Sequence, residues 1–518
     1  MNQAPPLEEY DAFALNTPLR EAASRAGADW ALEKLHGLGA IVGSAEGRDH
    51  AERSDRNPPV LERYDGVGDR VDRVVRDPSW HWLVDRTVEY DLHGMTFRKD
   101  NPPAHAARAA MILTWSELSL PTVCPVSANY AIMPALAMDP ALQARHAPGL
   151  LSTDSGSVTF AAASMTERQG GSDIRGTATV ATPQADGSYS ITGQKWFVTC
   201  PWGDVVLVLA RAPGGLTCFV VESAHPGYRI ERLKDKLGWH ALGVGEVELH
   251  DAPGHRIGEE GKGVGVIMRM ISFTRLDVML ENAAVLRVGT MRAIHNARHR
   301  HVLGKLLTDH GAMRNVLADL ALESEAATAG VMHVAGSYDI AGSRLSRIAL
   351  TLMKYWLSKR AAGHAAEALE CLGGNGYVEA SGMPRLMRDS VVGSVWEGSG
   401  NVAALDILRV LHGDPESVEQ FLMECEAARG GNALLDQWID ALRAEIRQVA
   451  QGGDPEWNAR LLTERMALAF QGSVLMRFAP NAVSDAFCAG RLGPRGMAYG
   501  TLPPSVDVDA LLARALPA

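Results

Sequence analysis

The chain has 518 residues and a mass of 55.6 kDa, which is enough for about three or four domains of ordinary size. Hydrophobic residues make up 46% of it and charged residues 21%, values that exclude an intrinsically disordered or collagen-like chain. Its net charge of −11 argues against a protein that coats nucleic acid by bulk charge.

The first region of the sequence, residues 1–157, has a helix-compatible spacing of Ala, Leu, Trp and Arg that is broken only by proline and glycine. Between 158 and 256 the sequence changes to short β-branched runs separated by turn residues, among them Asp186-Gly187, a dipeptide typical of hairpins. About five or six such runs predict a small sheet or barrel.

Helix-like sequence returns in residues 257–412, with long stretches over 311–335 and 345–372. The stretch before them is apolar on more than one face, which predicts a helix inside a bundle. Residues 413–518 follow as a further helical region that ends, after about residue 500, in a loose, proline-rich tail. This order predicts a mainly α protein with a central β domain and disfavours Rossmann and TIM-barrel folds.

Several features of the sequence exclude whole classes of site. The six cysteines are widely spaced without a CxxC pair, the N-terminal sequence is acidic, and no apolar stretch approaches the roughly 18–20 residues of a membrane span. We therefore expect a cytoplasmic protein without a membrane segment. P-loop, HExxH, GxSxG and GxGxxG patterns are absent, and His299 and His301 have no carboxylate or cysteine at ligand spacing, so we expect no bound metal.

Three separated segments combine Gly, Ser and Thr with an aromatic or acidic residue: 165–173 (MTERQGGSD), 194–199 (QKWFVT) and 395–401 (VWEGSGN). Each alone would be a simple turn. In this order they resemble the acyl-CoA dehydrogenase family, whose pattern has TE-x-x-(A/G)GSD, K-x-W-I-T and EGT segments. The stretch 300–304 (RHVLG) resembles the family's RxxFG motif, with Leu303 in place of the aromatic, and 372–377 (LGGNGY) resembles its LGGxGY motif.

Finer features resemble the AidB branch of this family, the flavoprotein class linked to the bacterial adaptive response to DNA alkylation. They are ERSDRNPPVLERYD near the N-terminus, IERLKDKLG, SVWEGSGN and an extension of roughly a hundred residues beyond 412. The resemblance implies the acyl-CoA dehydrogenase fold with an extra C-terminal helical domain. The expected division is an N-terminal helical domain (1–157), a β-barrel (158–256), a helical bundle (257–412) and a helical extension (413–518).

The resemblance also implies an FAD cofactor and a homotetramer built as a dimer of dimers. A flavin needs backbone and hydroxyl donors for its ring and pyrophosphate, and small residues let the backbone approach closely. Phe197 stands where the family usually has Trp, and Arg300 either reaches the FAD of a neighbouring subunit or is a solvated surface charge. The implied cofactor-binding residues are Met165, Thr166, Gly171, Ser172, Phe197, Val198, Thr199, Arg300, Trp396, Gly398, Ser399, Gly400 and Asn401.

Glu397 is the catalytic base that the resemblance implies, removing the proton next to a thioester while a hydride passes to flavin N5. A few family members carry the base on an earlier helix, where this chain has Thr274 and no acid. Trp396 would raise the pKa of Glu397 and the following helix N-terminus would favour its anion, and the sequence leaves that balance open. The alternative is a glutamate that only caps the helix. Arg409 either faces the same pocket or pairs with an acid such as Asp406.

In the AidB branch the C-terminal domain is implicated in binding double-stranded DNA. Residues 412–518 contain nine arginines and no lysine against fourteen acidic residues, a net charge of −5 that is unfavourable for counterion release. Two pairs of arginines on one face or turn could hold phosphate locally, but solvated helix faces that balance nearby acids are the simpler interpretation. The pairs are Arg443 with Arg447 and Arg491 with Arg495. A further set shares helical spacing and predicts packing: Leu462, Met466, Phe470 and Val474.

Three functional hypotheses follow. The first is an AidB-like FAD flavoprotein in the response to alkylation, with weak or residual acyl-CoA dehydrogenase activity through Glu397. The second is a metabolic acyl-CoA dehydrogenase without a DNA role, which the acidic extension favours. The third is a protective DNA-binding flavoprotein without catalysis, which requires salt-sensitive affinity for duplex DNA. An oxidase that passes electrons to oxygen is a variant of these.

Overall fold

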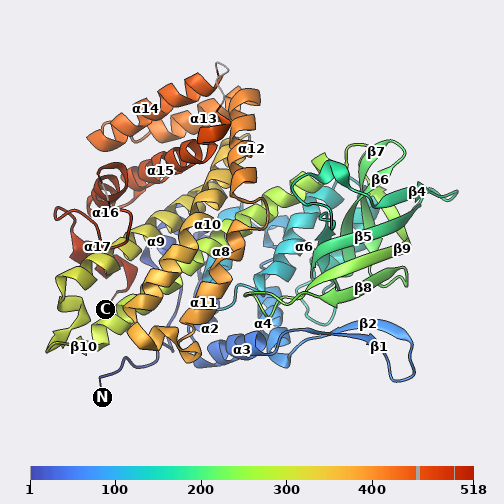
Figure 1. Cartoon of the computed structure of the whole chain (residues 1–518), viewed down its shortest axis with the longest axis horizontal. Helices are drawn as coiled ribbons and strands as arrows, with labels where there is room; N and C mark the ends of the chain where they lie inside the picture. Colours follow the sequence, from blue (N-terminus) through green and yellow to red (C-terminus); the bar gives the residue numbers. More distant parts are fainter. Residues whose placement is uncertain (1, 451–454, 495, 518) are drawn as a thin grey trace. The chain divides into compact units, whose positions relative to one another are not determined.

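The computed structural model describes residues 2–450, 455–494 and 496–517 (Figure 1). The chain forms two compact units. We name residues 1–45, 102–117 and 275–518 the helical unit, and residues 46–101 and 118–274 the barrel unit. The boundary between them falls inside one long helix, α8 (Gly263–His299), at Arg275.

The barrel unit contains two kinds of element, a sheet and the helices around it. Its strands are β1 (Val60–Tyr64), β2 (Arg70–Val75), β3 (Ala161–Ser164), β4 (Val180–Pro183), β5 (Tyr189–Thr199), β6 (Val205–Ala212), β7 (Gly215–Glu222), β8 (Tyr228–Leu233) and β9 (Val244–Ile257). Its helices are α3 (Ala45–Arg56), α4 (Pro78–Glu89), α6 (Val123–Leu136), α7 (Pro140–Leu150) and the first part of α8.

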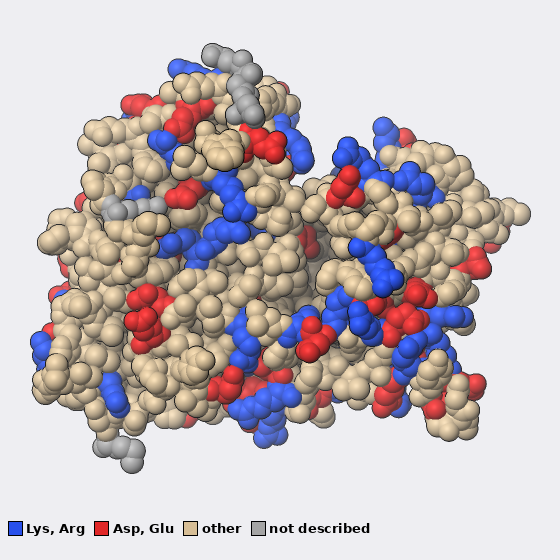
Figure 2. Space-filling view, in the orientation of Figure 1, with Lys and Arg blue, Asp and Glu red and all other residues tan. Residues whose placement is uncertain are grey.

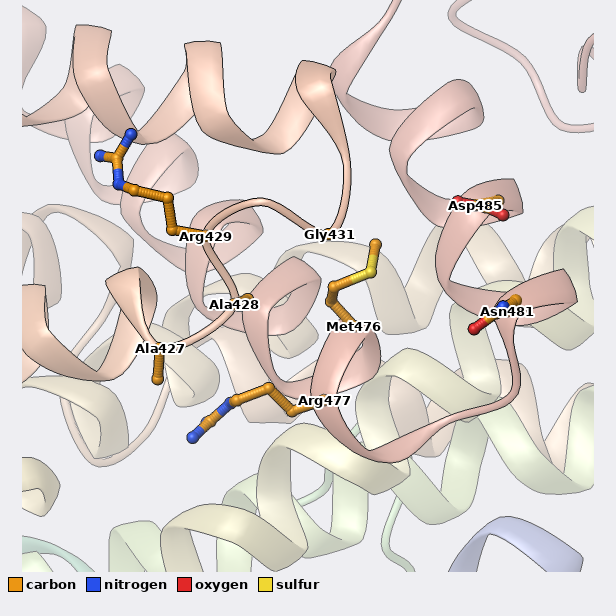
Figure 3. A pocket seen from close by; sticks show the side chains of 8 residues that line it. All are labelled: Ala427, Ala428, Arg429, Gly431, Met476, Arg477, Asn481 and Asp485. Carbon is orange, nitrogen blue, oxygen red and sulfur yellow. The ribbon is translucent and has the colours of Figure 1, made fainter.

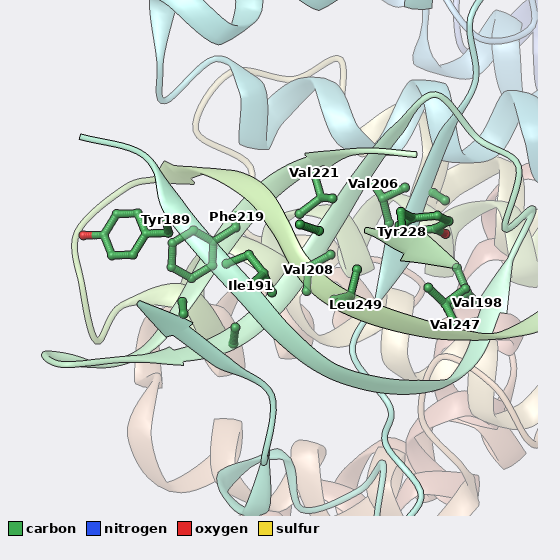
Figure 4. Close-up of a cluster of buried hydrophobic side chains, with 14 of the residues drawn as sticks. Tyr189, Ile191, Val198, Val206, Val208, Phe219, Val221, Tyr228, Val247 and Leu249 are labelled. Atoms are coloured by element: carbon green, nitrogen blue, oxygen red, sulfur yellow. The ribbon is translucent and has the colours of Figure 1, made fainter. Parts of the chain in front are cut away.

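Strands β3 to β9 form one sheet that closes on itself. Strand β6 pairs with β3, β4 and β7, while β9 pairs with β5, β7 and β8. The antiparallel hairpin from β4 to β5 turns at Gly187, whose φ of 87° requires the left-handed region, so the hairpin predicted at Asp186-Gly187 is confirmed. Apolar side chains from alternate strand positions, including Ile191, Val208 and Phe219, fill the interior (Figure 4).

Strand β5 carries a β-bulge at the second predicted motif. Lys195 pairs with Val247 and Val198 pairs with Gly245, so Trp196 and Phe197 together face one residue of β9. Lys195 and Val198 are fully buried, whereas the Phe197 side chain is 51% exposed. Because a bulge interrupts the alternation of a strand, it turns two adjacent aromatic residues outward.

Helices α6 and α7 cover the outer surface of β6 and β7, with residues such as Ile132, Leu136 and Leu150 packed on Leu207 and Val220. Residues 205–210 of β6 are therefore buried on both faces, which explains their unbroken apolar sequence. The expectation of an all-helical region 1–157 was wrong for residues 60–75, which form the hairpin β1–β2. Its alternating valines and the glycines of its turn were obscured by the helical sequence around them.

The helical unit is built mainly from helices. They are α1 (Thr17–Arg25), α2 (Leu32–Val42), α5 (His105–Ser116), the rest of α8, α9 (Gly311–Ser337), α10 (Leu345–Cys371), α11 (Met383–Ser390), α12 (Gly400–Gly413), α13 (Pro415–Glu426), α14 (Ala433–Ala450), α15 (Ala459–Phe478), α16 (Asn481–Phe487) and α17 (Val508–Ala515). A short hairpin, β10 (His301–Val302) and β11 (Lys305–Leu306), separates α8 from α9.

Helix α15 of the extension packs against α9, α10 and α12. The apolar stripe predicted on it is buried, with Met466, Phe470 and Val474 fully enclosed, so the packing prediction is confirmed. The proline-rich tail is not loose as expected, because it ends in α17, which packs against α9. Arg514 of α17 donates to Glu325 at 2.8 Å and to Glu21 at 2.5 Å.

The predicted fold class, mainly α with a central β-barrel, is confirmed (Figure 1). The long helices over 311–335 and 345–372 lie within two residues of α9 and α10. Within the described ranges, no helix combines the length and the apolar character that crossing a membrane would need. The four domain boundaries stay a prediction.

Candidate functional site

The first predicted segment is a loop of the barrel unit that folds against β5. The backbone N–H of Trp196 donates to the backbone carbonyl of Thr166 at 2.9 Å. This hydrogen bond joins the loop to β5, the strand that carries Phe197 and Thr199. A methyl group built on Gly171 would lie 2.9 Å from the Thr166 hydroxyl, so this position requires glycine. The predicted residues range from exposed (Ser172, Phe197) through half-buried (Met165, Thr166, Gly171, Thr199) to buried (Val198).

The loop and the adjoining strands β3 and β5 present several hydroxyl groups without a hydrogen-bonding partner among the described residues. The hydroxyls of Thr166, Ser172 and Thr199 make no hydrogen bond with another residue in the described part of the chain. The Ser164 hydroxyl, at the end of β3, is buried and also without a partner there. A buried unpaired hydroxyl costs free energy, and a ligand rich in acceptors would satisfy it. The donor set therefore fits FAD, whose ring carbonyls and pyrophosphate are acceptors.

A buried ion pair joins this loop to β5. The Lys195 ammonium lies 2.8 Å from Glu167 Oε1 and also donates to the carbonyl of Leu209 at 2.6 Å. Glu167 accepts further hydrogen bonds from the N–H groups of Ala178 and Thr179 at 2.7 and 3.1 Å. Burial alone would raise the pKa of Glu167, but Lys195, Thr179 and Ala178 lower it to about 2. Glu167 is therefore ionised at any physiological pH.

The aromatic bulge of β5 lies beside cationic side chains. The Lys234 ammonium is 3.5 Å from the centroid of the Trp196 ring and 4.6 Å from that of Phe197. The guanidinium of Arg168 lies 5.1 Å from the Trp196 ring. Lys234 is itself paired with Glu246 at 2.6 Å. Such contacts hold the indole by its electron-rich face, while half of Phe197 remains available to a ligand.

The third predicted segment is a strained loop of the helical unit. Glu397 has a φ of 52° and Gly398 a φ of 98°, and a left-handed glutamate persists only when its surroundings hold it. The Arg275 guanidinium of α8 donates to the carbonyl of Glu397 at 2.9 Å. The Lys354 ammonium of α10 donates to the carbonyls of Trp396 and Gly398 at 2.7 and 2.5 Å. Two buried cations thus bind three successive carbonyls.

Helix α12 begins directly after this loop, at Gly400. The Ser399 side chain forms no capping hydrogen bond there. A methyl group on Gly400 would lie 2.8 Å from Lys359 Cε and 3.2 Å from an Arg460 nitrogen. Arg460, from α15 of the extension, also donates to the Asn401 side-chain oxygen at 2.7 Å. The extension therefore contributes a residue to the second half of the predicted site.

A second carboxyl group lies near Glu397. Burial raises the pKa of Glu281 on α8 well above its usual range, and the neighbouring Asp277 and Glu397 act in the same direction. Burial and these neighbours therefore favour the neutral form of Glu281. Asp277, one turn before it, is fully buried and forms a bidentate ion pair with Arg108 of α5 at 2.6 and 2.7 Å. This pair joins α8 to α5 next to Glu281.

The remaining predicted residues lie elsewhere in the helical unit. Arg300 directly follows α8, and its guanidinium donates to the carbonyl of Asn2. Leu303, at the position of the family aromatic, is 92% exposed at the tip of the β10–β11 hairpin. Arg409 is exposed, and the expected partner Asp406 instead contacts Arg347 at 3.2 Å and Arg275 at 3.7 Å.

The structure thus assembles two separate halves of the predicted site. Thr166, Gly171 and the bulge of β5 lie together in the barrel unit, and residues 396–401 lie together in the helical unit. Their convergence on one ligand stays a prediction. Sequence reasoning missed Glu167, Lys195, Glu281, Lys354 and Arg460. A lysine inside the apolar stretches of β5 and α10 was the available signal for two of them.

The arginines considered for DNA binding are largely engaged within the chain. Arg443 pairs with Glu426, and Arg491 is buried against Asp319 at 2.5 Å and Glu323 at 3.0 Å. Arg447 is exposed, and Arg495 lies outside the described residues. In the view of Figure 2, basic and acidic side chains are interspersed over the helices of the helical unit. Arg491 is therefore a structural residue.

A cavity of about 360 Å³ lies in the extension, where the α13–α14 connection meets α15 and α16 (Figure 3). Its arginines are both paired, Arg429 with Asp440 at 2.8 Å and Arg477 with Glu424. Met476 packs on Gly431, where a methyl group would lie 2.6 Å from its side chain. The cavity contains none of the predicted site residues. Its lining is Ala427, Ala428, Arg429, Gly431, Met476, Arg477, Asn481 and Asp485.

Comparison with known proteins supplies three family matches along the chain. Residues 2–155 match the adaptive response protein AidB N-terminal domain, residues 162–252 the acyl-CoA dehydrogenase middle domain, and residues 261–412 the acyl-CoA dehydrogenase C-terminal domain. The putative acyl-CoA dehydrogenase AidB of Escherichia coli is 34% identical over 515 residues, which covers 96% of this chain and 94% of that protein.

Two further similarities extend over most of the chain. Acyl-CoA dehydrogenase family member 11 of Caenorhabditis elegans is 28% identical over 437 residues, 77% of this chain and 70% of that protein. A solved structure, C. elegans ACDH-11 in complex with C11-CoA, has the same fold with a TM-score of 0.83 and 23% identity, covering 99% of this chain and 92% of that one. The chain therefore belongs to the acyl-CoA dehydrogenase family, a family of FAD-dependent oxidoreductases that act on CH–CH groups, and within it to the AidB branch.

Proposed function

We propose that this protein binds FAD and oxidises a CH–CH bond next to a thioester, with Glu397 as the base. The observation that carries the proposal is the loop at Glu397, where Arg275 and Lys354 hold a strained glutamate through its backbone. When bound, FAD supplies an acceptor for the hydride. Thr166, Ser172 and Thr199 would donate to its acceptor atoms, and Phe197 would cover its ring.

Glu397 performs the proton transfer in this proposal. The proton next to a thioester carbonyl is weakly acidic, and a carboxylate removes it when it is positioned and partly desolvated. Glu397 is half-buried, and its left-handed backbone fixes the direction in which its side chain leaves the loop. Burial and the neighbouring acids favour the neutral form of Glu281 beside it, which limits the repulsion between the two carboxyl groups.

The substrate class that we propose is an acyl-CoA. A CoA ligand occurs in the C. elegans relative of the same fold, which is described as a complex with C11-CoA. The activity in this chain is proposed to be weak or residual, as in the first of the sequence hypotheses. A metabolic acyl-CoA dehydrogenase without a DNA role remains the alternative, and efficient steady turnover of one acyl-CoA would favour it.

Anaerobic bleaching of the bound flavin tests this function. We expect purified protein to be yellow, and a panel of acyl-CoAs of increasing chain length to bleach its absorbance near 450 nm, a wavelength typical of flavins. Glu397→Gln should slow bleaching about 10²- to 10⁴-fold, the usual contribution of a general base. Glu370→Gln, an exposed glutamate on α10, is the matched control and should bleach like the parent. Colourless protein that cannot be reconstituted with FAD would refute the proposal.

A role in the adaptive response to DNA alkylation is the second part of the proposal. It is supported by the match of residues 2–155 to the N-terminal domain of the adaptive response protein AidB. Double-stranded DNA is its proposed partner through the extension, with the exposed Arg447 as a candidate contact among the described residues. Titrating duplex DNA at rising salt tests this, because phosphate contacts lower the affinity steeply with salt. A flat salt response, or equal binding by Arg447→Gln, would count against the DNA role.

The oligomeric state and location complete the proposal. We propose a homotetramer, in which Arg300 contacts the FAD of a neighbouring subunit, and a cytoplasmic location. The exposed Leu303 beside Arg300 is an apolar group that a subunit contact would bury. Light scattering of the purified protein measures the mass, and a monomer of 55.6 kDa would refute the tetramer. Leu303→Asp should then dissociate the tetramer.

A further inference from the structure

Lys354 is a buried lysine that takes no part in the proposed proton transfer itself. It lies in the middle of α10 and is 2% exposed. Its ammonium donates to the carbonyl of Trp396 at 2.7 Å and to that of Gly398 at 2.5 Å, the carbonyls on either side of Glu397. Lys354 therefore links the residue before Glu397 to the residue after it.

The surroundings of Lys354 raise the free energy of its charged form. Burial lowers the pKa of Lys354 to about 7, and Arg275 of α8 and Lys359 of α10 act in the same direction. Glu397 acts in the opposite direction and favours the charged form. A methionine of similar length would fill the same space without this cost. Packing alone therefore does not explain a lysine at this position.

We propose that Lys354 is a positioning residue for Glu397, which it holds through the two flanking carbonyls and keeps ionised by its charge. The inference rests on the proposed function, because it takes Glu397 as the base. It concerns a residue of α10, outside the loop motif that the family resemblance covers. The ammonium acts through the backbone and through the electrostatic field, and it does not itself exchange a proton with the substrate.

The coupling between the two groups has a definite sign. An interaction that favours the charged form of Lys354 favours the charged form of Glu397 by the same free energy, because binding linkage is reciprocal. Glu281 also faces Glu397, and burial and Asp277 raise its pKa and so favour its neutral form. We therefore expect a change in the charge of one of these two groups to shift the titration of the other.

Infrared spectroscopy of the FAD-loaded full-length protein tests this directly. The C=O stretch of protonated Glu397 is identified as the band that Glu397→Gln removes, and its intensity is followed against pH. In Lys354→Met we expect the titration to move to higher pH by at least about one unit, a ten-fold gain in proton affinity. Lys354→Arg keeps the charge and should stay within about half a unit of the parent. Lys34→Met, an exposed lysine on α2, is the control and should not move it.

An unchanged Glu397 titration in folded Lys354→Met would overturn the proposal. If that variant does not fold, the reciprocal measurement decides: in Glu397→Gln, the carbon-13 signal of the Lys354 ε-methylene should titrate at lower pH than in the parent. Equal titration would also overturn the proposal. Neither readout needs turnover, so an absence of flavin bleaching would refute the base role alone. Normal bleaching with uncoupled titrations would refute only the positioning role.

Discussion

The two loops that carry the predicted site are both stabilised by hydrogen bonds between the backbone and a buried charged side chain, but the charges have opposite sign. In the barrel unit, the carboxylate of Glu167 accepts hydrogen bonds from backbone N–H groups of the segment after the loop. In the helical unit, Lys354 and Arg275 donate to backbone carbonyls of the loop itself. The sign of each charge matches the backbone groups that it binds. A carboxylate can only accept hydrogen bonds and so binds N–H groups, whereas an ammonium can only donate and so binds carbonyls.

The difference lies in how firmly each charge is held near neutral pH. The pKa of Glu167 is lowered to about 2, so its charge is constant over the physiological range. The pKa of Lys354 is lowered by burial to about 7, so its charge changes within that range. We therefore expect the stability of the cofactor loop in the barrel unit to be constant near neutral pH, and the stability of the Glu397 loop to change with pH.

Removing the charge of Glu167 should have the largest effect on stability. Glu167→Gln leaves the Lys195 ammonium buried without its counter-ion, which typically costs about 3–5 kcal/mol. The pKa of Glu167 is lowered from its usual value to about 2, so its contribution is complete above about pH 4.5. It is lost as the pH falls from about 4.5 to about 2. Calorimetric melting at pH 7 and pH 3 measures this, and the deficit should shrink at pH 3.

Glu248→Gln is the control for that experiment. Glu248 lies on β9 of the same unit, is partly exposed and pairs only with His250 among the described residues. Its loss should change stability by less than about 0.5 kcal/mol, as is typical of surface substitutions. An equal loss in both variants would show that buried and exposed charges are equivalent here, which would contradict the comparison.

The pH dependence of stability should distinguish the two loops next. The pKa of Lys354 is lowered from its usual 10.5 to about 7, so between these values the unfolded chain binds more protons. Stability from this group therefore rises with pH across that window, by about 1.4 kcal/mol per unit. Lys354→Met should lack this rise, whereas Lys34→Met should keep it. Melting temperatures measured from pH 7 to 10 provide the check, and parallel curves would contradict it.

Much of this architecture follows from the sequence. The unbroken helical spacing of residues 311–335 predicts α9, and Asp186-Gly187 predicts a hairpin, because both signals are local. The hairpin β1–β2 and the helix α17 were not predicted. The first is short and surrounded by helices, and the second is a short helix stabilised by packing on α9 and by the pairing of Arg514 with Glu325.

The candidate site was predictable only where its residues form a contiguous motif. Thr166, Phe197 and Glu397 lie in recognisable segments, so their roles could be proposed from the chain alone. Lys354 and Arg460 act on the Glu397 segment from other helices, at sequence separations of 44 and 59 residues from Gly398 and Asn401. No local pattern connects such residues, because tertiary packing alone brings α10 and α15 to the loop.

The strain in the Glu397 loop should be measurable through Gly398. Its φ of 98° disfavours any side chain, and a methyl group there would lie 3.2 Å from Arg275. Gly398→Ala should cost about 1–2 kcal/mol, the usual penalty of a left-handed residue, and should weaken FAD retention. Gly413→Ala, at the other end of α12, has open space around it and no such φ. Equal melting temperatures for the two variants would mean that the loop is unstrained.

The smallest expected effect concerns the contact that the extension makes with the Glu397 loop. Arg460→Gln removes the hydrogen bond to Asn401, and because Arg460 is exposed the loss of stability should be only about 0.5–1 kcal/mol. Asn401 follows the first residue of α12, so the same change should alter the FAD dissociation constant by a few-fold. Arg447→Gln, an exposed arginine on α14, is the matched control. Titration of the apoprotein with FAD measures the dissociation constants of both variants. Equal constants would mean that the extension does not contribute to FAD binding, whereas weaker binding in Arg460→Gln alone would make the extension part of the site.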